Sequence, residues 1–170
     1  FKSARYLRTQ MMGEERRALL RLVLPSGGVN YIGFVCFRRG TGPLRWSDAF
    51  VYLSGEKMSE TTRRTTLPLV AESKKGVLDR LVSHESEYVR SFPAIARASR
   101  LMNAGKFAEA WNEAASIPES VQTDRTVLML RLRAAQKLGD EKYLRVIEEW
   151  ERTYPGDPTL DFVAIDGDTL

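Results

Sequence analysis

The sequence predicts an α+β fold in which a helix and a three-stranded antiparallel meander are followed by antiparallel helix pairs, so that the chain is mostly helical overall. Two observations carry this prediction. Three short runs rich in aliphatic and aromatic residues lie within residues 18–53 and are separated by glycine-rich turns. From Ser59 onward the apolar residues instead recur at helical spacing. Short turns join antiparallel neighbours, because parallel strands need a long crossover.

The first 58 residues predict a small sheet with a helix in front of it. Residues 3–12 are compatible with a helix that Gly13 ends as a C-terminal cap. Strands are expected at residues 18–24, 29–38 and 44–53, and each run stops at a cluster of turn residues. The middle strand is apolar on both faces. We therefore expect a neighbouring element on each face, with the opening helix on one of them.

The rest of the chain predicts helices. Residues 59–72 form one that Pro68 should kink or break, and residues 75–92 form another. Ser91 is then expected to cap a helix over residues 93–104 that pairs with one over 106–117. A second pair is expected at residues 125–138 and around the apolar stripe of residues 143–154. Asp157 is expected to open a third unit.

A half-repeat in this region resembles the tetratricopeptide repeat. Gly105 and Gly139 lie 34 residues apart, the sequence Ala-Gly-Lys-Phe at 104–107 surrounds the first turn, and Pro118 and Pro155 follow the second helices. The resemblance covers residues 91–170. Compared with the first unit, the second unit has two more residues between its glycine and the aromatic residue that follows. The second helix of each pair therefore repeats after 36 residues rather than 34.

The first part looks like a cystatin-like or nuclear-transport-factor-like α+β domain in its element order, and the stretches 30–31 and 46–56 are similar to bacterial proteins that join such a sheet to tetratricopeptide repeats. We accordingly expect a sheet domain at 1–58, connecting helices at 59–90 and helical repeats at 91–170 with the last unit truncated. Phe1 in first place and the stop soon after Pro158 lead us to expect truncation at both ends, which leaves the compartment unpredicted.

The favoured function is a non-enzymatic interaction module. In the family that the repeats resemble, the first helix of each pair lines a groove for an extended peptide, and arginine forks onto carboxylates. A protein or peptide, acidic in character, is therefore the expected partner. The predicted peptide-binding residues are Arg97, Arg100, Asn103, Arg131 and Arg133.

The alternative function is a small-ligand or enzymatic pocket on the sheet. On strict alternation Asp48 shares one face with Trp46 and Tyr52, and Tyr31 of the middle strand completes the possible lining. A buried Asp has a raised pKa and can act as a base. Asp48 equally fits a structural role at a bulge, at an edge, or in an ion pair with Arg45 or Arg21. Homodimerisation through the sheet edge also stays open.

Other chemistry has little support in the sequence. His84 is the sole histidine and Cys36 the sole cysteine, so neither a two-histidine metal site nor an intramolecular disulfide is predicted, and no catalytic residue, metal or cofactor is assigned. Residues 1–58 carry ten Lys and Arg against four Asp and Glu, but these cations are scattered, so no specific nucleic-acid site is predicted. No run of 18 apolar residues predicts a transmembrane segment.

Overall fold

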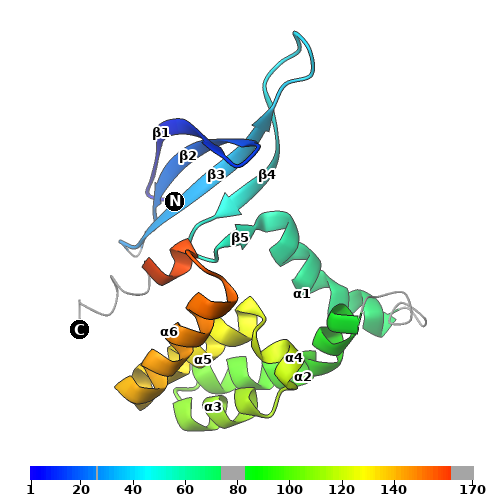
Figure 1. Cartoon of the computed structure of the whole chain (residues 1–170), viewed down its shortest axis with the longest axis vertical. Coiled ribbons are helices and arrows are strands. Elements are labelled where there is room, and N and C mark those ends of the chain that lie inside the picture. The colour runs from blue at the N-terminus through cyan, green and yellow to red at the C-terminus, as the bar shows by residue number, and fades with distance from the viewer. Residues whose placement is uncertain (26, 74–82, 162–170) are drawn as a thin grey trace. The chain divides into compact units, whose positions relative to one another are not determined.

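The computed structural model describes residues 1–25, 27–73 and 83–161 (Figure 1). Their contacts divide the chain into two compact units. The sheet unit comprises Phe1–Arg64 together with the C-terminal residues from Asp157, and the helical unit comprises Thr65–Gly156. An antiparallel sheet precedes the helices, which confirms the predicted α+β class with its helical majority.

The sheet is a five-stranded meander in the order β1-β2-β3-β4-β5, and every neighbouring pair is antiparallel. Its strands are β1 (Ser3–Met12), β2 (Glu15–Val23), β3 (Val29–Phe37), β4 (Arg45–Val51) and β5 (Glu56–Lys57). The three expected strands correspond to β2, β3 and β4 within a few residues at each end. A turn between residues 24 and 28 joins β2 to β3, and residues 38–44 join β3 to β4; both connections contain glycine, as the clusters predict.

The expected helix over residues 3–12 is wrong, because this segment is strand β1. Gly13 has a φ of 60°, and it forms the turn between β1 and β2 rather than a helix cap. The pairing of β1 with β2 runs from Ser3 opposite Val23 to Met12 opposite Glu15. This ladder satisfies backbone groups along the whole strand, so pairing with a distant segment outweighs the local helix propensity.

The two faces of the sheet differ in chemistry because side chains alternate along each strand. Residues in register across the strands share a face. The polar face, as we call it, carries Arg5, Arg8, Gln10, Glu15, Arg17, Arg21, Asp48, Phe50, Tyr52 and Lys57, together with Leu19, Tyr31 and Val35. The apolar face carries Tyr6, Met11, Ala18, Leu20, Leu22, Ile32, Phe34 and Trp46, together with the polar residues Thr9, Arg16 and Asn30.

Two register shifts interrupt this alternation. One lies in β1 between Tyr6 and Arg8, where Leu7 is the extra residue. The other lies where β3 passes from Val35 to Cys36 and β4 contributes Ser47 as the extra residue. Because each insertion moves the following side chains to the other face, these bulges decide which residues can meet.

The helices of the structure are α1 (Met58–Ser73), α2 (Ser83–Asn103), α3 (Phe107–Ala115), α4 (Glu119–Gln122), α5 (Arg125–Leu138) and α6 (Asp140–Thr153). The expected helix over 125–138 is confirmed at both ends by α5. Its Asp124 side chain accepts a hydrogen bond from the Thr126 N–H at 2.8 Å, which is an N-cap. The short helix α4 was not expected.

Proline proves a weaker helix breaker here than expected. Pro68 lies inside α1, which continues on both sides of it. Helix α2 likewise runs through Pro93, so the break expected at residues 91–93, with Ser91 as a cap, is wrong. The rest of the helix expected over 75–92 falls partly outside the described residues. Asp157 does accept a hydrogen bond from the Thr159 N–H at 3.0 Å, and residues 158–161 are helical.

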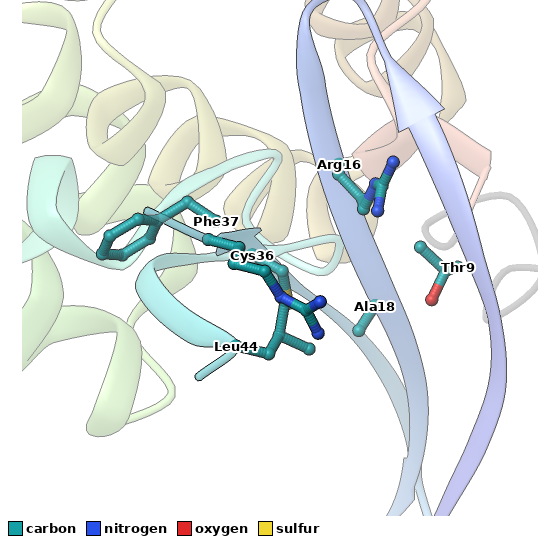
Figure 2. Close-up of a pocket in the computed structure, with 7 residues that line it drawn as sticks. Thr9, Arg16, Ala18, Cys36, Phe37 and Leu44 are labelled. Carbon is teal, nitrogen blue, oxygen red and sulfur yellow. The ribbon is translucent and has the colours of Figure 1, made fainter. Parts of the chain in front are cut away.

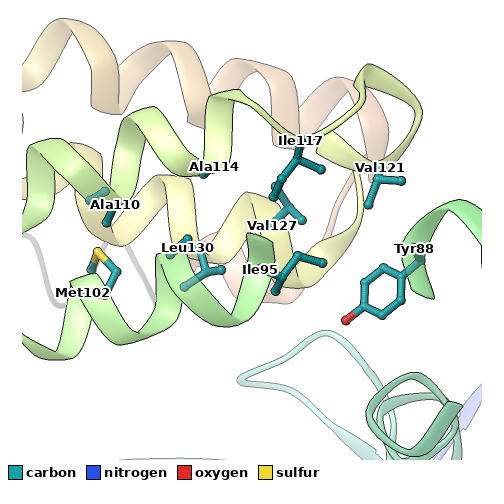
Figure 3. Packing of buried hydrophobic residues seen from close by; sticks show 11 residues of the cluster. Tyr88, Ile95, Met102, Ala110, Ala114, Ile117, Val121, Val127 and Leu130 are labelled. Atoms are coloured by element: carbon teal, nitrogen blue, oxygen red, sulfur yellow. The ribbon is translucent and has the colours of Figure 1, made fainter. Parts of the chain in front are cut away.

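The hydrophobic core of the helical unit lies where α2, α3, α4 and α5 meet (Figure 3). Ile95 and Met102 of α2 pack with Ala110 and Ala114 of α3 and with Val127 of α5. The small alanines on α3 allow close approach of the neighbouring helices. Trp150 of α6 is completely buried. Within the helical unit, α2 therefore packs on α3, α3 on α5, and α5 on α6.

Candidate functional site

Asp48 lies in the middle of β4, beside the bulge at Ser47, and its side chain contacts the start of α1. Its Oδ1 accepts hydrogen bonds from the Ala49 N–H at 2.8 Å and the Ser59 N–H at 3.2 Å. Its Oδ2 accepts a hydrogen bond from the Ser59 hydroxyl. Because Ser59 is in the first turn of α1, Asp48 satisfies an N–H that the helix itself leaves unpaired. Both oxygens are therefore engaged in holding the start of the helix.

The protonation of Asp48 follows from these contacts. Burial raises the pKa of this carboxyl, but the hydrogen bonds from Ser59 and Ala49 together outweigh burial and hold the pKa below the ordinary 3.8. Hydrogen bonds to the charged form favour that form. Asp48 is thus a stabilised anion, which is a poor proton acceptor at neutral pH.

Of the four residues of the expected sheet pocket, Tyr31, Asp48 and Tyr52 lie on the polar face by their register, and Trp46 lies on the apolar face. Tyr52 packs edge-on against Phe50, with ring centres 5.1 Å apart, on the polar face. Trp46 packs edge-on against Phe34 at 5.4 Å on the apolar face, because the bulge at Ser47 reverses the alternation. The Tyr52 N–H donates to the Tyr31 carbonyl at 3.0 Å, so these two residues are neighbours. Asp48 is bonded to Ser59 rather than to Arg45 or Arg21.

The polar face holds an ordered cluster of charged side chains. Arg17 donates two hydrogen bonds to one oxygen of Glu15, at 3.0 and 2.6 Å, and its guanidinium lies over the Phe50 ring at 4.4 Å. The other Glu15 oxygen accepts a hydrogen bond from Lys57. The Lys57 and Arg17 donors lower the pKa of Glu15, and Glu15 in turn raises the pKa of Lys57. The cluster therefore stays ionised across the physiological range.

Close to that cluster, the Gln10 side chain donates to the Tyr52 hydroxyl at 3.1 Å, although Gln10 belongs to the first strand and Tyr52 directly follows the fourth. A Cβ added at Gly33 would lie 3.3 Å from the Arg17 side chain and 3.6 Å from the Tyr52 ring. The absence of a side chain at Gly33 thus leaves room for Arg17 and Tyr52 to fold over the middle of the sheet.

In the helical unit, the expected peptide-binding residues fall into two groups. Arg131 is 8% exposed, and its guanidinium forms a bidentate ion pair with Glu149 of α6 at 2.8 and 2.7 Å. It also lies 5.7 Å from the centre of the Trp111 ring. Arg131 thus joins α3, α5 and α6 and is not presented to solvent.

The other four residues are exposed. Arg97, Arg100 and Asn103 follow one another along the exposed side of α2, and Arg133 is exposed on α5. Arg97 forms an ion pair with Glu113 of α3 at 2.7 Å. The exposed side of α2 also includes Arg90, which was not among the expected residues.

A groove of about 420 Å³ lies beside α2, between this helix and the segment that follows α3. Arg90 and Arg97 contribute cations to its lining, and Ala94 and Ile117 contribute apolar surface. The remaining lining residues are Glu87, Ser91, Ser116 and Pro118. The groove thus combines two guanidinium groups, one of them paired with Glu113, and the Glu87 carboxylate with a small apolar surface.

A second hollow, of about 600 Å³, lies in the sheet unit (Figure 2). Thr9, Arg16, Ala18 and Cys36 come from three adjacent strands, and Leu44 precedes the fourth. The half-buried Cys36 thiol donates to the Phe34 carbonyl at 3.3 Å, which leaves it a packing residue of the sheet. His84 is exposed near the start of α2.

Comparison with known proteins gave no relative: no family model, no curated protein and no solved structure matches this chain. Among the described residues, no helix is both long and apolar enough to cross a membrane. Within the same residues no three His, Cys, Asp or Glu side chains gather in a way that could hold a metal ion.

Sequence reasoning missed two features of these sites. Arg90 was missed because a new helix was expected to begin at residue 93, which would put Arg90 and Arg97 on different helices. Both residues belong to α2, and their seven-residue spacing places them on the same side of it. Trp46 lies on the other face from Tyr52 because of the bulge at Ser47. A prediction from strict alternation along the strand cannot reveal such an inserted residue. In the sequence, the only indication of this bulge was Asp48, an acidic residue in the middle of the strand next to Ser47.

Proposed function

We propose that this protein is a non-enzymatic interaction module whose helical unit binds an acidic segment of another protein. The observation that carries the proposal is the groove beside α2, in which Arg90 and Arg97 flank the apolar surface of Ala94 and Ile117. A peptide that alternates carboxylates with a small apolar side chain complements this lining in both charge and polarity.

The charges around the groove favour such a partner. Arg90, Arg97 and Arg100 lie at seven- and three-residue spacings, so they follow one side of α2. Within the described part of the chain, Arg90 and Arg100 have no carboxylate partner, and only Arg97 forms an ion pair. The resemblance of residues 91–170 to tetratricopeptide repeats supports the same proposal, because arrays of that family bind extended peptides. Arg131 has no part in it, since its side chain is buried and forms a bidentate pair with Glu149, whereas the side chain of Arg97 is exposed despite its ion pair with Glu113.

The test is binding of labelled peptides to the full chain, followed by fluorescence anisotropy. Peptides with two or three Asp or Glu residues around one Leu or Val are compared with versions in which the acids are Gln or Asn. We expect the acidic peptides to bind, the amide versions to bind at least tenfold more weakly, and salt to weaken the acidic peptides.

The decisive variant is Arg90→Glu, because Arg90 has no ion pair in the described structure whose loss would disturb the fold. The matched control is Arg152→Glu, which reverses an exposed arginine at the end of α6. We expect R90E to abolish binding and R152E to keep it. Equal binding by both variants would remove the groove from the proposal.

A further inference from the structure

The bulge in β1 places two arginines opposite each other on the polar face of the sheet. On the side toward the β1–β2 turn, Arg8 pairs with Leu19 and shares the polar face with Gln10. If that register continued, Arg5 would lie opposite Leu22 and point to the apolar face. The extra residue Leu7 shifts the register by one, so Arg5 instead pairs with Arg21. Bulges of this kind re-aim a side chain.

Two like charges directly opposite in an antiparallel pair are unfavourable, because the Cβ atoms of such a pair lie only about 5 Å apart. Neither arginine has a carboxylate partner among the described residues. The Nε atom of Arg21 is buried and has no hydrogen-bond acceptor in the described structure. A buried donor without an acceptor costs free energy, so this position calls for an acceptor oxygen.

The carboxylates of the strands are engaged elsewhere. Glu15 holds Arg17 and Lys57, Asp48 holds Ser59, and Glu56 forms an ion pair with Arg64. Glu14 lies in the β1–β2 turn, and Glu15 beside it is six residues from Arg21 along β2, a separation of about 20 Å. An acceptor for Arg5 and Arg21 therefore has to come from outside these strands.

We propose that Arg5 and Arg21 form a binding site for an oxyanion, the phosphate or carboxylate group of a ligand. Guanidinium groups present N–H donors in a planar fork that matches two oxygens of such a group. One anion between the two guanidinium groups cancels the repulsion across the strands, and rotation of the Arg21 side chain toward that anion brings an acceptor within reach of its Nε. This site is separate from the groove beside α2, so it goes beyond the proposed function.

The test uses the full chain and measures its thermal unfolding with increasing inorganic phosphate, succinate or chloride at constant ionic strength. A ligand that binds only the folded state raises Tm by mass action. At about ten times the dissociation constant we expect a rise of about 5 °C for the anion that fits, whereas chloride has no such effect. Phosphate and succinate distinguish the two classes of oxyanion. Isothermal titration calorimetry with the same anions measures binding directly.

Three variants locate the effect. Arg5→Gln and Arg21→Gln each remove one half of the site, and Arg16→Gln removes an arginine from the same strand as Arg21 but from the opposite face. We expect R5Q and R21Q to lose the stabilisation by the oxyanion and R16Q to retain it. Because Arg5 is exposed, R5Q tests the site even if R21Q disturbs the fold.

The proposal also predicts a difference without any ligand. In chloride alone, R5Q should be at least as stable as the wild type, because the variant removes a like-charge pair. No stabilisation beyond chloride in the wild type, or the same stabilisation in R5Q, R21Q and R16Q, would overturn the site, since the anions would then act on the whole surface.

Discussion

At the scale of single residues, Asp48 connects the sheet to the first helix. Ordinarily the residue just before a helix caps its free N–H groups. Here Lys57 holds that place and has no capping side chain, so an Asp from β4 supplies the acceptor from eleven residues upstream of Ser59. Glu60 completes the arrangement by accepting a hydrogen bond from the Lys57 N–H at 3.0 Å. Asp48 is thus better explained as a structural anion than as a base.

The first prediction follows from this role. Asp48→Ala should lower the free energy of unfolding by about 1 kcal/mol at neutral pH, which is the usual cost of a lost cap. Asp48→Asn should lose less, because its amide oxygen still accepts the Ser59 N–H. Urea unfolding of the three proteins measures both values.

The pH dependence of the same variants gives a sharper signature. The folded pKa of Asp48 lies below 3.8, so its stabilisation is complete above that pH and is lost as the pH falls through the folded pKa. The difference between wild type and D48A should therefore shrink as the pH falls below 3.8. A difference that stays constant as the pH falls well below 3.8 contradicts the role of the charge.

The second prediction concerns the buried ion pair of the helical unit. Arg131→Met leaves Glu149, which is only 22% exposed, without its bidentate partner. We expect a loss of about 2 kcal/mol, less than for a completely buried carboxylate. The double variant R131M/E149M removes both charges and should recover part of this loss. A double-mutant cycle from urea unfolding measures the coupling, and additive losses would show that the two side chains act independently.

At the scale of elements, the sequence was most informative where local pattern and tertiary packing agree. Helix α5 could be predicted to the residue, because Asp124 caps it and Gly139, with a φ of 120°, ends it. Segment 3–12 has no such signals, since its strand structure depends on the partner strand β2. The candidate sites were poorly predicted for the same reason, because they depend on distant parts of the chain. Both bulges and the burial of Arg131 arise from long-range pairing, so no local pattern reveals them.

Helix α2 shows how packing overrides a helix breaker, and this gives the third prediction. Pro93 lies within α2 and, like every proline, has no N–H to donate to the helix. Because Pro93 is exposed, it also contributes little buried surface. A proline in a helix interior is about 3 kcal/mol less favourable than alanine. Pro93→Ala should therefore raise the free energy of unfolding, by about 1–2 kcal/mol after the gain in unfolded-chain entropy.

The matched control for P93A is Pro118→Ala. Pro118 precedes α4 and has a φ of −51°, a value that proline favours. Here the same substitution should lower the stability by about 0.5 kcal/mol, because it only frees the unfolded chain. Opposite signs in the two variants are the expected result. A loss of stability in P93A would mean that the proline packs favourably in α2.

At the scale of the whole molecule, the two units differ in how they are stabilised. The buried apolar cluster, from Tyr88 to Ala134, belongs entirely to the helical unit. Among the described residues of the sheet unit, the buried hydrophobic side chains are Leu19, Leu22 and Ala49. The sheet unit instead relies on its hydrogen-bond ladders and on the Glu15 cluster. Buried apolar area is the main source of folding free energy, so the helical unit should be the more stable of the two.

This difference gives the fourth prediction. A fragment of residues 58–156, which keeps α1 whole and contains the entire buried cluster, should fold by itself with a cooperative thermal transition in far-ultraviolet circular dichroism. A fragment of residues 1–57 buries too little apolar surface and should lack such a transition. In the full chain, hydrogen exchange should then be slowest for amides of α2, α3 and α5 and faster throughout β1–β4. Slower exchange in the strands than in these helices would mean that the sheet carries the stability of the molecule.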